Sequence, residues 1–524
     1  MSSAIGKMPA VAVSSPAASG QHILKNSRRE NFPGWYREVI DAAKLAEDSI
    51  VPGCMVILPL GVEVWNQVKA QFGEMLRRGK CSHDYQFPLF IPSSLFAQEA
   101  EHVAGFAKEC AVVTHHRMMV DGSGKMVPDP TAKLDEPLIV RPTSETIIGE
   151  SFRGWIRSKK DLPRLVNQWC NVIRMERATR PFLRTTEFFW QEGHCAFATE
   201  PEGRANALKM AQAYETFMTQ VCALPVILGE KSPGERFAGA VQTFTLEAMM
   251  QDGKAVQSGT SHYLGDNFAR ASHIQFTDGD GEKKYAHTTS WGISTRLIGS
   301  MIMTHSDDNG LRLPPRIAPV HVVIIPSGSG AKADKKAIRD AYIPRVEALF
   351  AGQRFEDREI SIELDDRDEK ELNAGEKGWD ALKKGTPIRI EIGPREAQRE
   401  TVTISRRDKD LSEKVEVPIT DIASYVIFAL GEIQQTYFRQ ALAYREALTR
   451  TDILTPEAMR AYFADPANIG FVRGKWCGDK STEETFKDLS VTIRCLPLDQ
   501  SGTNGICILT GRPATIDAIF GRSY

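Results

Sequence analysis

The sequence predicts three structural units: an α+β domain built on a mainly antiparallel sheet, an α/β domain, and a small α+β C-terminal module. Strand-like and helix-like segments with long connections indicate the first unit. Prolines cluster over Leu313–Pro319, and beyond them strands alternate with helices, which is typical of an α/β domain. We therefore expect the first domain over residues 31–317, the second over 318–433 and the module over 434–524.

The bulk properties are those of an ordinary globular protein. The chain has 524 residues, of which 42% are hydrophobic and 25% are charged. Its formal net charge is -2, so any contact with RNA must come from local basic patches. No apolar run reaches the roughly 18 residues of a membrane helix. Nine cysteines, an odd number, argue against a disulfide framework and favour a reducing, cytoplasmic location.

Residues 1–30 differ in composition from the rest of the chain. They are rich in Ala, Ser and Pro, and Glu30 is the first acidic residue. An organelle transit peptide has a similar composition, but here the arginines come late and a clear amphipathic stripe is missing. We therefore expect a disordered N-terminal tail rather than a transit peptide.

The elements of the first domain follow from hydrophobic spacing. Four bulky apolar residues recur three or four positions apart, namely Trp65, Val68, Phe72 and Leu76. This spacing predicts a helix over Val62–Arg78 that ends at Gly79. The run Tyr85–Ile91 predicts a strand that Pro92 ends. Further strands are expected over Leu165–Met175, Glu187–Phe197, Val256–Tyr263 and Tyr285–Gly292, and helices over Ala205–Cys222 and Ser294–Thr304.

The second domain begins with a β-branched run, Val320–Ile325, which predicts a buried strand followed by a glycine turn. The alternation then continues as helix Lys335–Phe350, strand Ile360–Leu364, helix Lys377–Lys384, strand Pro387–Ile392 and helix Ile422–Tyr444.

Charged residues at the end of one predicted strand indicate a phosphate site. Arg174 and Glu176 lie two positions apart and would point to the same face of a strand. The loop that follows contains Arg177, Arg180 and Arg184. Guanidinium groups bind phosphate oxygens bidentately and stay charged at all relevant pH values. From these residues alone, a phosphate site and a surface salt bridge are about equally supported.

The segment Arg141–Glu145, Arg-Pro-Thr-Ser-Glu, has two interpretations. Thr143 and Ser144 could cap the helix that follows, with Glu145 stabilising its first turn. Alternatively, a glutamate held near the end of a loop could receive a substrate ammonium group. Capping is the more common role for a residue such as Ser144.

Two further segments could contact a ligand. In Gln257–His262, small residues allow the backbone to approach a ligand closely, although His262 could equally be a hydrogen-bonded core histidine. Arg296 follows the segment Ser290-Trp291-Gly292 and would lie on the first turn of a helix, where an arginine suits a phosphate.

The order of these segments resembles the class II aminoacyl-tRNA synthetases. Residues Arg174–Glu192 resemble the second signature of that family, and Trp291–Arg296 resembles the third. The helix from Val62 and the strand ending at Pro92 resemble the first signature, which builds the dimer interface in that family. The segments that resemble prolyl-tRNA synthetases of the archaeal and eukaryotic type in particular are Arg141–Glu145, Pro181–Thr185, Trp190–Phe197 and Gln257–His262.

This resemblance, which extends from about Asn31 to Tyr524, implies the class II synthetase fold and a proline-tRNA ligase. Such an enzyme uses ATP and Mg²⁺ to form prolyl-adenylate and transfers proline to the 3′ end of proline tRNA, and we expect a homodimer without a membrane segment. The residues that the resemblance assigns are Thr143, Glu145, Arg174 and His262 for proline, Arg174, Glu176, Arg184, Thr185, Gln257, Thr260, Ser290 and Arg296 for ATP, and Arg174 and Arg296 for catalysis.

The resemblance also bears on editing. Bacterial-type relatives carry an editing domain between their second and third signatures. Here a predicted helix and strands already occupy the interval from Glu192 to Gln257, which leaves no room for another domain of about 50 residues. We therefore expect that this chain does not edit misacylated tRNA by itself.

The second domain and the module carry their own resemblances. Five residues of the second domain fit the anticodon-binding domain of this subgroup, namely Trp379, Gly385, Pro387, Arg389 and Gly393. Many relatives hold a zinc ion in the module with four cysteines, but here Thr482 and Thr510 stand at two of the four positions, beside Cys477 and Cys507. Since structural zinc needs four good ligands, we expect neither zinc nor another metal bound by the chain itself.

Two alternatives are kept. Another class II synthetase, for threonine or serine, is disfavoured by Thr143, Glu145 and His262. A non-catalytic RNA-binding paralogue is disfavoured because Arg174 and Arg296 are both present, as is the α/β domain.

Overall fold

The structure is a computed structural model that describes residues 24–98, 110–327, 336–368, 371–410 and 412–524. Most of the predicted tail, residues 1–23, lies outside the described residues. Residues 24–30 correct the prediction, because they pack against the core. Leu24 is buried among core residues, and its amide donates to the Asp308 carbonyl at 3.2 Å. Arg28 forms an ion pair with the Asp308 carboxylate at 3.2 Å.

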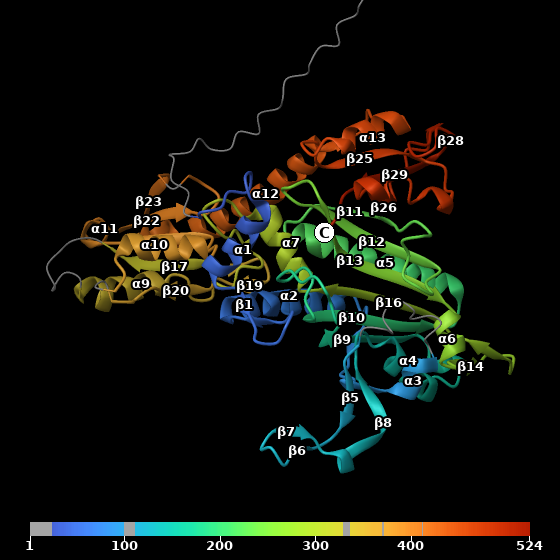
Figure 1. The fold of residues 1–524 in the computed structure, drawn as a ribbon. Coiled ribbons are helices and arrows are strands. Elements are labelled where there is room, and N and C mark those ends of the chain that lie inside the picture. Colours follow the sequence, from blue (N-terminus) through green and yellow to red (C-terminus); the bar gives the residue numbers. More distant parts are fainter. Residues whose placement is uncertain (1–23, 99–109, 328–335, 369–370, 411) are drawn as a thin grey trace, which may run out of the picture.

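An eleven-stranded, mainly antiparallel sheet forms the centre of the molecule (Figure 1). Parallel pairs occur only at its two ends, where β24 joins β25 and β3 joins β9. This arrangement confirms the predicted fold class of the first domain. In spatial order the strands are β24 (Thr449–Arg450), β25 (Phe471–Trp476), β29 (Ile516–Gly521), β26 (Thr492–Pro497), β11 (Val226–Glu230), β12 (Gln242–Met249), β13 (Ala255–Gly265), β16 (His287–Ser294), β10 (Glu187–Phe197), β9 (Arg164–Ile173) and β3 (His83–Asp84).

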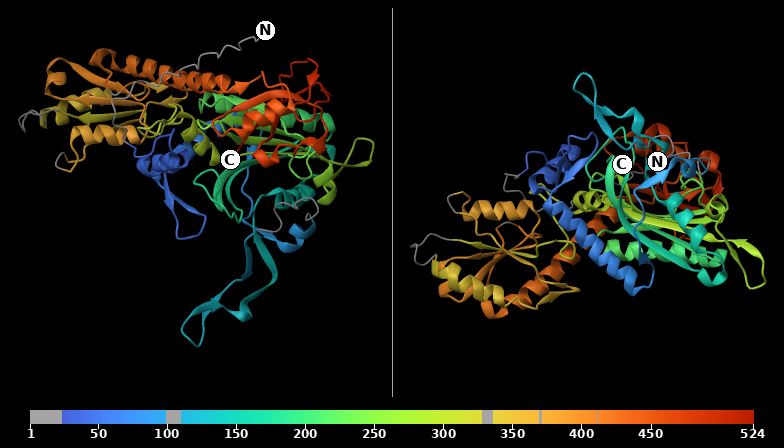
Figure 2. Two further views of the ribbon diagram at one scale, coloured as in Figure 1. Left: turned by 45° about the horizontal axis from the view of Figure 1, so that its top comes forward. Right: turned by 90° about the horizontal axis from the view of Figure 1, so that it is seen from below.

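Helices lie on both faces of this sheet: α5 and α2 pack on one face, and α4 packs on the other beside β9 and β10 (Figure 2). On α5, Tyr214 lies 6.2 Å from the Trp291 ring of β16 and 5.1 Å from the Phe72 ring of α2. The apolar face of α2, including Trp65, is therefore buried within the chain itself. The helices of this region are α1 (Phe32–Ala43), α2 (Pro59–Arg78), α3 (Ser93–Gln98), α4 (Glu145–Trp155), α5 (Glu200–Gln220), α6 (Asn267–Ala271) and α7 (Arg296–His305).

The strand predicted over Tyr85–Ile91 is wrong for most of its length. Only the short strands β3 and β4 (Phe90–Pro92) flank that segment. Side chains satisfy the middle of this segment: the Phe87 amide donates to the Gln168 side chain at 3.1 Å, and the Arg141 guanidinium donates to the carbonyls of Phe87 at 2.9 Å and Pro88 at 3.3 Å. A strand would pair these groups with backbone.

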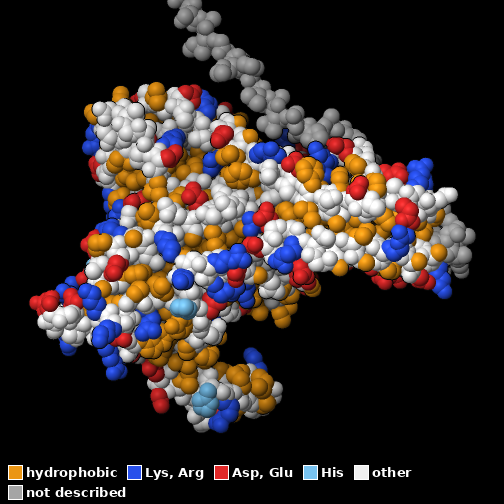
Figure 3. Space-filling view, turned by 180° about the vertical axis from the view of Figure 1, so that it is seen from behind, with side chains coloured by type: hydrophobic (Ala, Val, Ile, Leu, Met, Phe, Trp, Pro, Cys, Tyr) orange, Lys and Arg blue, Asp and Glu red, His pale blue; other side chains and the backbone are white. Residues whose placement is uncertain are grey.

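An arm projects from the body of the molecule at the bottom of Figure 1. Its tip is a hairpin whose exposed apolar side chains include Met118, Met119, Val120 and Met126. Hydrophobic side chains are visible on this arm in Figure 3. Its strands are β5 (Val112–His115), β6 (Met118–Val120), β7 (Met126–Pro128) and β8 (Lys133–Val140), and two other small pairs are β1 (Ala46–Asp48) with β2 (Met55–Ile57) and β14 (Gln275–Thr277) with β15 (Lys283–Tyr285).

The second domain is an α/β unit, as predicted, with a mixed five-stranded sheet. Its first three strands are parallel, and two antiparallel strands that were not predicted complete it. In spatial order these are β20 (Ile362–Leu364), β17 (Val322–Pro326), β21 (Ile388–Ile392), β22 (Thr401–Arg406) and β23 (Lys414–Pro418), and the helices are α9 (Ile343–Ala348), α10 (Ala374–Lys383), α11 (Pro394–Gln398) and α12 (Ile422–Ala447). A π-helical turn, Ile338–Tyr342, precedes α9, and Lys335 lies outside the described residues.

The C-terminal module extends the central sheet. Its strand β26 pairs with β11, with Gly229 opposite Pro497, and its helix is α13 (Pro456–Ala464). At this seam Glu247 is buried between Lys231, at 2.9 Å, and Arg494, at 3.1 Å. The helix α12 continues through the predicted boundary at residues 433/434 (Figure 2). The three domain ranges stay predictions. No described helix combines the length and apolarity needed to cross a membrane.

Candidate active site

A cavity of about 330 Å³ opens on the face of the central sheet opposite α5. Successive residues of β16 point to opposite faces, so Trp291 faces α5 while Ser290 and Gly292 line the cavity. The predicted residues that line it are Thr143, Glu145, Arg174, Gln257, Thr260, His262, Ser290 and Arg296. The structure thus brings most of the predicted site together, whereas Glu176, Arg184 and Thr185 are outside this lining.

Strand β10 supplies cavity residues to which the sequence analysis assigned no role. Phe188, Trp190, Glu192 and His194 occupy alternate positions and therefore share one face of the strand. Gly193, between two of them, lies under Trp291, where an added Cβ would come within 2.1 Å of the ring. A period-two run that includes Glu and His within an otherwise apolar strand is the signal that could have identified this wall.

A β-bulge determines how β13 faces the cavity. The pairing of β12 with β13 shifts between Leu246 and Glu247, so one residue of β13 is left over. Gln257, Thr260 and His262 consequently point to the same side, although strict alternation would place Gln257 on the other. The bulge therefore brings these three side chains to one wall of the cavity.

Arg174 lies directly after the end of β9, in the middle of the cavity wall. Its Nε donates to the Pro142 carbonyl at 3.0 Å, and its guanidinium carbon lies 5.3 Å from the Phe188 ring and 5.5 Å from the Trp190 ring. Burial lowers the pKa of Arg174 to about 10, with a further lowering by Arg296 that Glu145 opposes. The side chain therefore stays cationic at neutral pH and is held in one orientation.

Arg296 begins α7 and is fixed from two sides. Its amide donates to the Ser294 hydroxyl at 3.2 Å, and its Nε donates to the Leu183 carbonyl at 3.0 Å. Burial and then the neighbouring Arg184 lower the pKa of Arg296. Two arginines that repel each other across one cavity favour a polyanionic ligand between them.

An acidic group lies beside Arg174. Potential ligand atoms of Glu145, Glu192 and His194 all lie within 4.8 Å of one another. Burial raises the pKa of Glu192, but hydrogen bonds from His194 and others outweigh this effect, and the pKa lies below its usual value. The donors to Glu192 include Gln168 at 2.6 Å and the Ser144 amide at 3.3 Å. This end of the cavity is thus anionic and suits an ammonium group.

Helix α4 shows how Glu145 reaches this place. Ser144 is the N-cap residue, but its side chain makes no capping bond and instead accepts from Gln168 at 2.8 Å, which corrects the expected side-chain cap. Glu145 does lie in the first turn of α4, where the helix dipole favours a carboxylate, and Thr143 donates to it.

His262 forms part of the cavity wall rather than of the core. Its Nδ1 is 3.0 Å from the Thr243 hydroxyl, and its ring lies 4.8 Å from that of Phe237. Burial, with a smaller effect of His194, lowers the pKa of His262 to about 3. The imidazole is therefore neutral at physiological pH and can offer hydrogen bonds and apolar surface but no charge.

The three predicted ATP-binding residues outside the lining are near it. Glu176 and Arg184 pair at 3.5 Å, and both influence the pKa of Arg296, so they lie close to that guanidinium. Thr185 is buried and donates to the Glu187 carbonyl at 2.7 Å, which is a structural contact at the start of β10. Their assignment to ATP stays a prediction.

The expected remnant of a zinc site is assembled in the C-terminal module. Burial raises the pKa of the Cys477 thiol, but hydrogen bonds involving the Asp479 backbone and the side chains of Cys507, Thr482 and Thr510 lower it below its usual value. All four predicted positions therefore lie together. Two of them offer hydroxyls, which are poor zinc ligands, and the expectation of no zinc stays a prediction.

Three family models match the chain. Residues 130–305 match the tRNA synthetase class II core domain (G, H, P, S and T), residues 321–428 match the anticodon binding domain, and residues 465–524 match the model described as Prolyl-tRNA synthetase, C-terminal.

Similar proteins extend over nearly the whole length. The chain is 49% identical to the proline–tRNA ligase of Protochlamydia amoebophila, over 95% of this chain and 98% of that protein. It is 47% identical to the proline–tRNA ligase of Bdellovibrio bacteriovorus and 48% identical to that of Paramagnetospirillum magneticum, with the same coverage in both cases.

Proposed function

Because the chain belongs to the family of proline–tRNA ligases, we propose that its cavity activates proline with ATP and passes it to proline tRNA. The observation that carries this proposal is the position of Arg174 between an anionic group and a second arginine. Proline carries its ammonium and its carboxylate on the same carbon, Cα. Its ammonium would lie at Glu145, and its carboxylate at Arg174, where the α-phosphate of ATP also has to lie.

The first step then needs charge neutralisation more than a general base, because a carboxylate is already a nucleophile. A proline carboxylate oxygen bonds to the α-phosphorus, the bond from that phosphorus to the bridging oxygen breaks, and pyrophosphate leaves. Arg174 stabilises charge that develops on the α-phosphate, and Arg296 holds the departing phosphates. In the second step the terminal ribose hydroxyl of the tRNA attacks the acyl carbon. The bond from this carbon to the phosphate oxygen breaks, AMP leaves, and the hydroxyl proton is released to water.

The floor of the cavity would hold the nucleotide. Gln257, Thr260 and Ser290 face it from β13 and β16. In the described structure the Ser290 hydroxyl is buried without a hydrogen-bond partner. A buried polar group of this kind is costly unless a ligand completes it, which supports a role in binding. Trp190 and Phe237 give the proline end an apolar wall.

Mg²⁺ does not fit the acidic group of the cavity. Glu145, Glu192 and His194 include an imidazole, whereas Mg²⁺ prefers an octahedron of oxygens. Glu192 already accepts hydrogen bonds from Gln168 and Ser144. We propose that Mg²⁺ enters with the phosphates of ATP, and no step of the reaction is assigned to a metal held by these side chains.

The decisive experiment is ATP–pyrophosphate exchange with Arg174→Ala. We expect proline-dependent exchange in the wild type and a loss of at least about 100-fold in the variant, because one preorganised charge is removed from the transition state. Arg153→Ala is the matched control, since Arg153 pairs with Glu150 on the exposed side of α4 and should leave the rate unchanged. Near-normal exchange by a folded Arg174→Ala protein would refute the proposal.

Exchange measured with proline, alanine, cysteine and threonine in turn tests which amino acid the protein activates.

Editing and assembly complete the proposal. The interval from Glu192 to Gln257 consists of α5, β11, β12 and the adjoining ends of β10 and β13 with their short connections, which supports the absence of editing in cis. Deacylation of alanyl-tRNA by the purified chain would contradict it.

We also propose a cytoplasmic homodimer, and light scattering would measure the oligomeric state. The apolar face of α2 around Trp65 is already buried within the chain, so a partner would have to contact other surfaces.

A further inference from the structure

A buried carboxylate joins the catalytic region to the domain that matches the anticodon-binding family. Asp307 is the second residue after α7, and Arg407 directly follows β22 of the second domain. The two form a bidentate pair, with Nη1 to Oδ2 at 2.9 Å and Nη2 to Oδ1 at 2.6 Å. Arg312, in the connection between the domains, approaches Oδ2 of the same carboxylate at 2.8 Å. The Arg407 side chain is 2% exposed. We refer to Asp307, Arg312 and Arg407 as the domain junction.

The remaining donors of Arg407 are also used at this boundary. Its Nε donates to the carbonyls of Leu311 at 3.0 Å and Leu382 at 3.2 Å, and Nη2 donates to that of Gly310 at 3.1 Å. Gly310 has a φ of +125°, and a Cβ there would lie 2.9 Å from the Cα of Lys383 on α10. The Arg407 guanidinium therefore hydrogen-bonds to three places at once: Asp307 just after α7, the connecting segment, and the end of α10.

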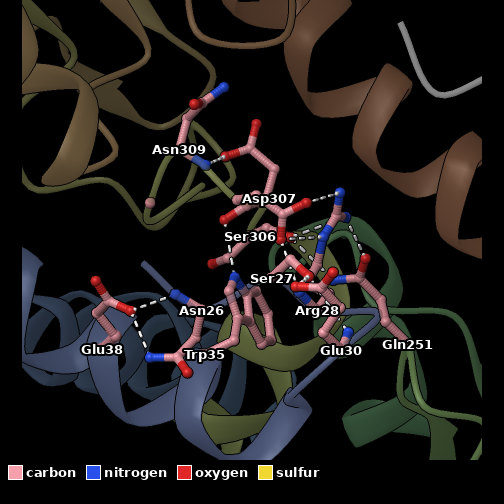
Figure 4. A network of polar contacts seen from close by, with 12 residues as sticks. Asn26, Ser27, Arg28, Glu30, Trp35, Glu38, Gln251, Ser306, Asp307 and Asn309 are labelled. Atoms are coloured by element: carbon pink, nitrogen blue, oxygen red, sulfur yellow. Dashed lines mark hydrogen bonds and ion pairs between the residues drawn. The ribbon is translucent and has the colours of Figure 1, made fainter. Parts of the chain in front are cut away.

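The N-terminal segment also contacts Asp307 and its neighbours, as Figure 4 shows for Trp35, Arg28 and Gln251. The Trp35 indole donates to the Asp307 carbonyl at 3.0 Å. Arg28 pairs with Asp308 and donates to the Gln251 side chain at 2.6 Å. Gln251 in turn donates to the Ser306 carbonyl at 2.9 Å. The segment after α7 is thus fixed to the catalytic core. Arg407 connects it to the second domain, together with contacts of α12 such as the stacking of Tyr437 on His305.

The two proposed steps differ in what they require from this junction. Activation of proline takes place within the cavity alone. Transfer to tRNA requires that one RNA molecule contacts the second domain and the cavity at the same time, so the relative orientation of the two matters only there. The helix α7 connects the two places, since Arg296 begins it and the junction follows its last residue, about 15 Å away along a ten-residue helix.

We propose that Asp307 and Arg407 are positioning residues for tRNA charging, which hold the second domain at the orientation from which a bound tRNA presents its 3′ end to the adenylate. This inference rests on the proposed function. It assigns no contact with proline or ATP to either residue. It predicts that loosening the junction separates the two steps, with the first preserved and the second impaired.

The test uses the full chain with Asp307→Asn, which keeps the shape of the side chain but removes the charge that both arginines share. Three quantities are measured: ATP–pyrophosphate exchange, kcat/KM for charging whole proline tRNA, and binding of an anticodon stem–loop. We expect exchange and stem–loop binding within about twofold of the wild type. Charging should fall about 10- to 100-fold, the loss that a misplacement of about 1 Å can cause. Arg407→Lys should follow the same pattern with a smaller loss.

Glu400→Gln is the matched control. Arg345 and Glu400 also form a bidentate pair, at 3.1 and 2.7 Å, but both belong to the second domain and the pair is exposed. All three measurements should stay at wild-type values.

Two outcomes would overturn the inference: unchanged charging in both junction variants, or exchange that falls as much as charging. If Asp307→Asn does not fold, Arg407→Lys alone decides between these results. Wild-type protein without proline-dependent exchange would instead refute the proposed function, so the two failures are distinguishable.

Discussion

At the scale of single residues, Arg174 is held in a fixed position, and both burial and the neighbouring Arg296 disfavour its charged form. Its Nε donates to the Pro142 carbonyl, and two aromatic rings flank the guanidinium, so its plane is held in one orientation at the cavity wall. Burial and Arg296 both lower its pKa, which means that an anion would relieve an existing electrostatic cost. The geometry of the guanidinium should therefore matter in addition to its charge.

This argument predicts that Arg174→Lys is not a conservative change. Lysine keeps the charge but loses the bidentate plane, the bond to Pro142 and the contact with Phe188. We expect kcat of ATP–pyrophosphate exchange to fall about 10- to 100-fold, which corresponds to about 1.4–2.8 kcal/mol of lost transition-state stabilisation. Arg153→Lys on the surface of α4 should leave it unchanged. Wild-type exchange by Arg174→Lys would show that charge alone is sufficient.

Two buried histidines predict how stability depends on pH. Burial lowers the pKa of His305 to about 4 and that of His321 to about 3, while an unfolded histidine titrates near 6.5. Between these values the unfolded chain binds more protons than the folded one. Stability is therefore fully present above about pH 6.5 and is lost as the pH falls through this window, by about 1.4 kcal/mol per pH unit for each histidine.

The variant His305→Gln tests this dependence. Glutamine cannot titrate, but it can donate to the Cys222 carbonyl that His305 contacts at 3.0 Å. Urea unfolding at pH 8, 6 and 5 should give a smaller loss of stability on acidification than in the wild type, by about 1.4 kcal/mol per pH unit below 6.5. At pH 8 the two proteins should differ only by a constant. Parallel pH dependences would contradict the expected neutral state of His305.

At the scale of elements, the spacing of apolar residues predicted those helices and strands that depend mainly on neighbours in sequence. The apolar spacing around Phe72 predicted α2, and the β-branched run Val320–Ile325 predicted β17. Three kinds of feature could not be predicted in this way. The bulge of β13 depends on its pairing with β12, the irregular course near Phe87 depends on Arg141 and Gln168, and the added strands β22 and β23 carry polar residues on their exposed side.

The candidate site likewise contains residues that the local sequence predicted and residues that only the structure identified. The arginines and the β13 residues that line the cavity were identified because their types are unusual for strands and for strand ends. The wall on β10 was missed because Glu192 and His194 were treated as parts of one continuous strand rather than as one of its faces. Thr185 was assigned to the nucleotide from resemblance, and its buried contact with Glu187 is visible only in three dimensions.

Packing between β10 and β16 predicts the effect of a single methyl group. In Gly193→Ala the Cβ would lie 2.1 Å from Trp291, whose ring is held by Tyr214. We expect a loss of about 1–3 kcal/mol in the free energy of unfolding. Gly431→Ala is the matched control, because this glycine lies within α12 with open space around its Cβ, and the same change should stabilise by about 0.5–1 kcal/mol. Urea unfolding measures both, and equal effects would contradict the steric argument.

At the scale of the whole molecule, the C-terminal module and the catalytic core share one sheet. The pairing of Gly229 with Pro497 and the burial of Glu247 between Lys231 and Arg494 connect segments more than two hundred residues apart in sequence. No local pattern indicates such pairing, which is why the module was expected to be a separate unit. Its last residue lies beside the cavity as a result.

That last residue predicts how the enzyme responds to a C-terminal extension. The Tyr524 amide donates to the Ala255 carbonyl at 3.1 Å, its hydroxyl donates to Asp252 at 2.7 Å, and Arg180 lies 5.3 Å from its ring. Arg180 belongs to the loop whose Leu183 carbonyl fixes Arg296. Displacing Tyr524 should therefore loosen the end of the cavity at Arg296 more than the end at Glu145.

We expect a C-terminal hexahistidine extension to raise the KM for ATP in the exchange assay about 3- to 30-fold, the range of one or two cation–π contacts, with a smaller change for proline. Tyr524→Phe separates the two parts of the contact, because it keeps the ring beside Arg180 and removes only the bond to Asp252. It should stay within about threefold of the wild type. A wild-type KM for ATP in the extended chain would contradict this prediction. It would show that the loop around Leu183 holds Arg296 without the contact between Arg180 and Tyr524.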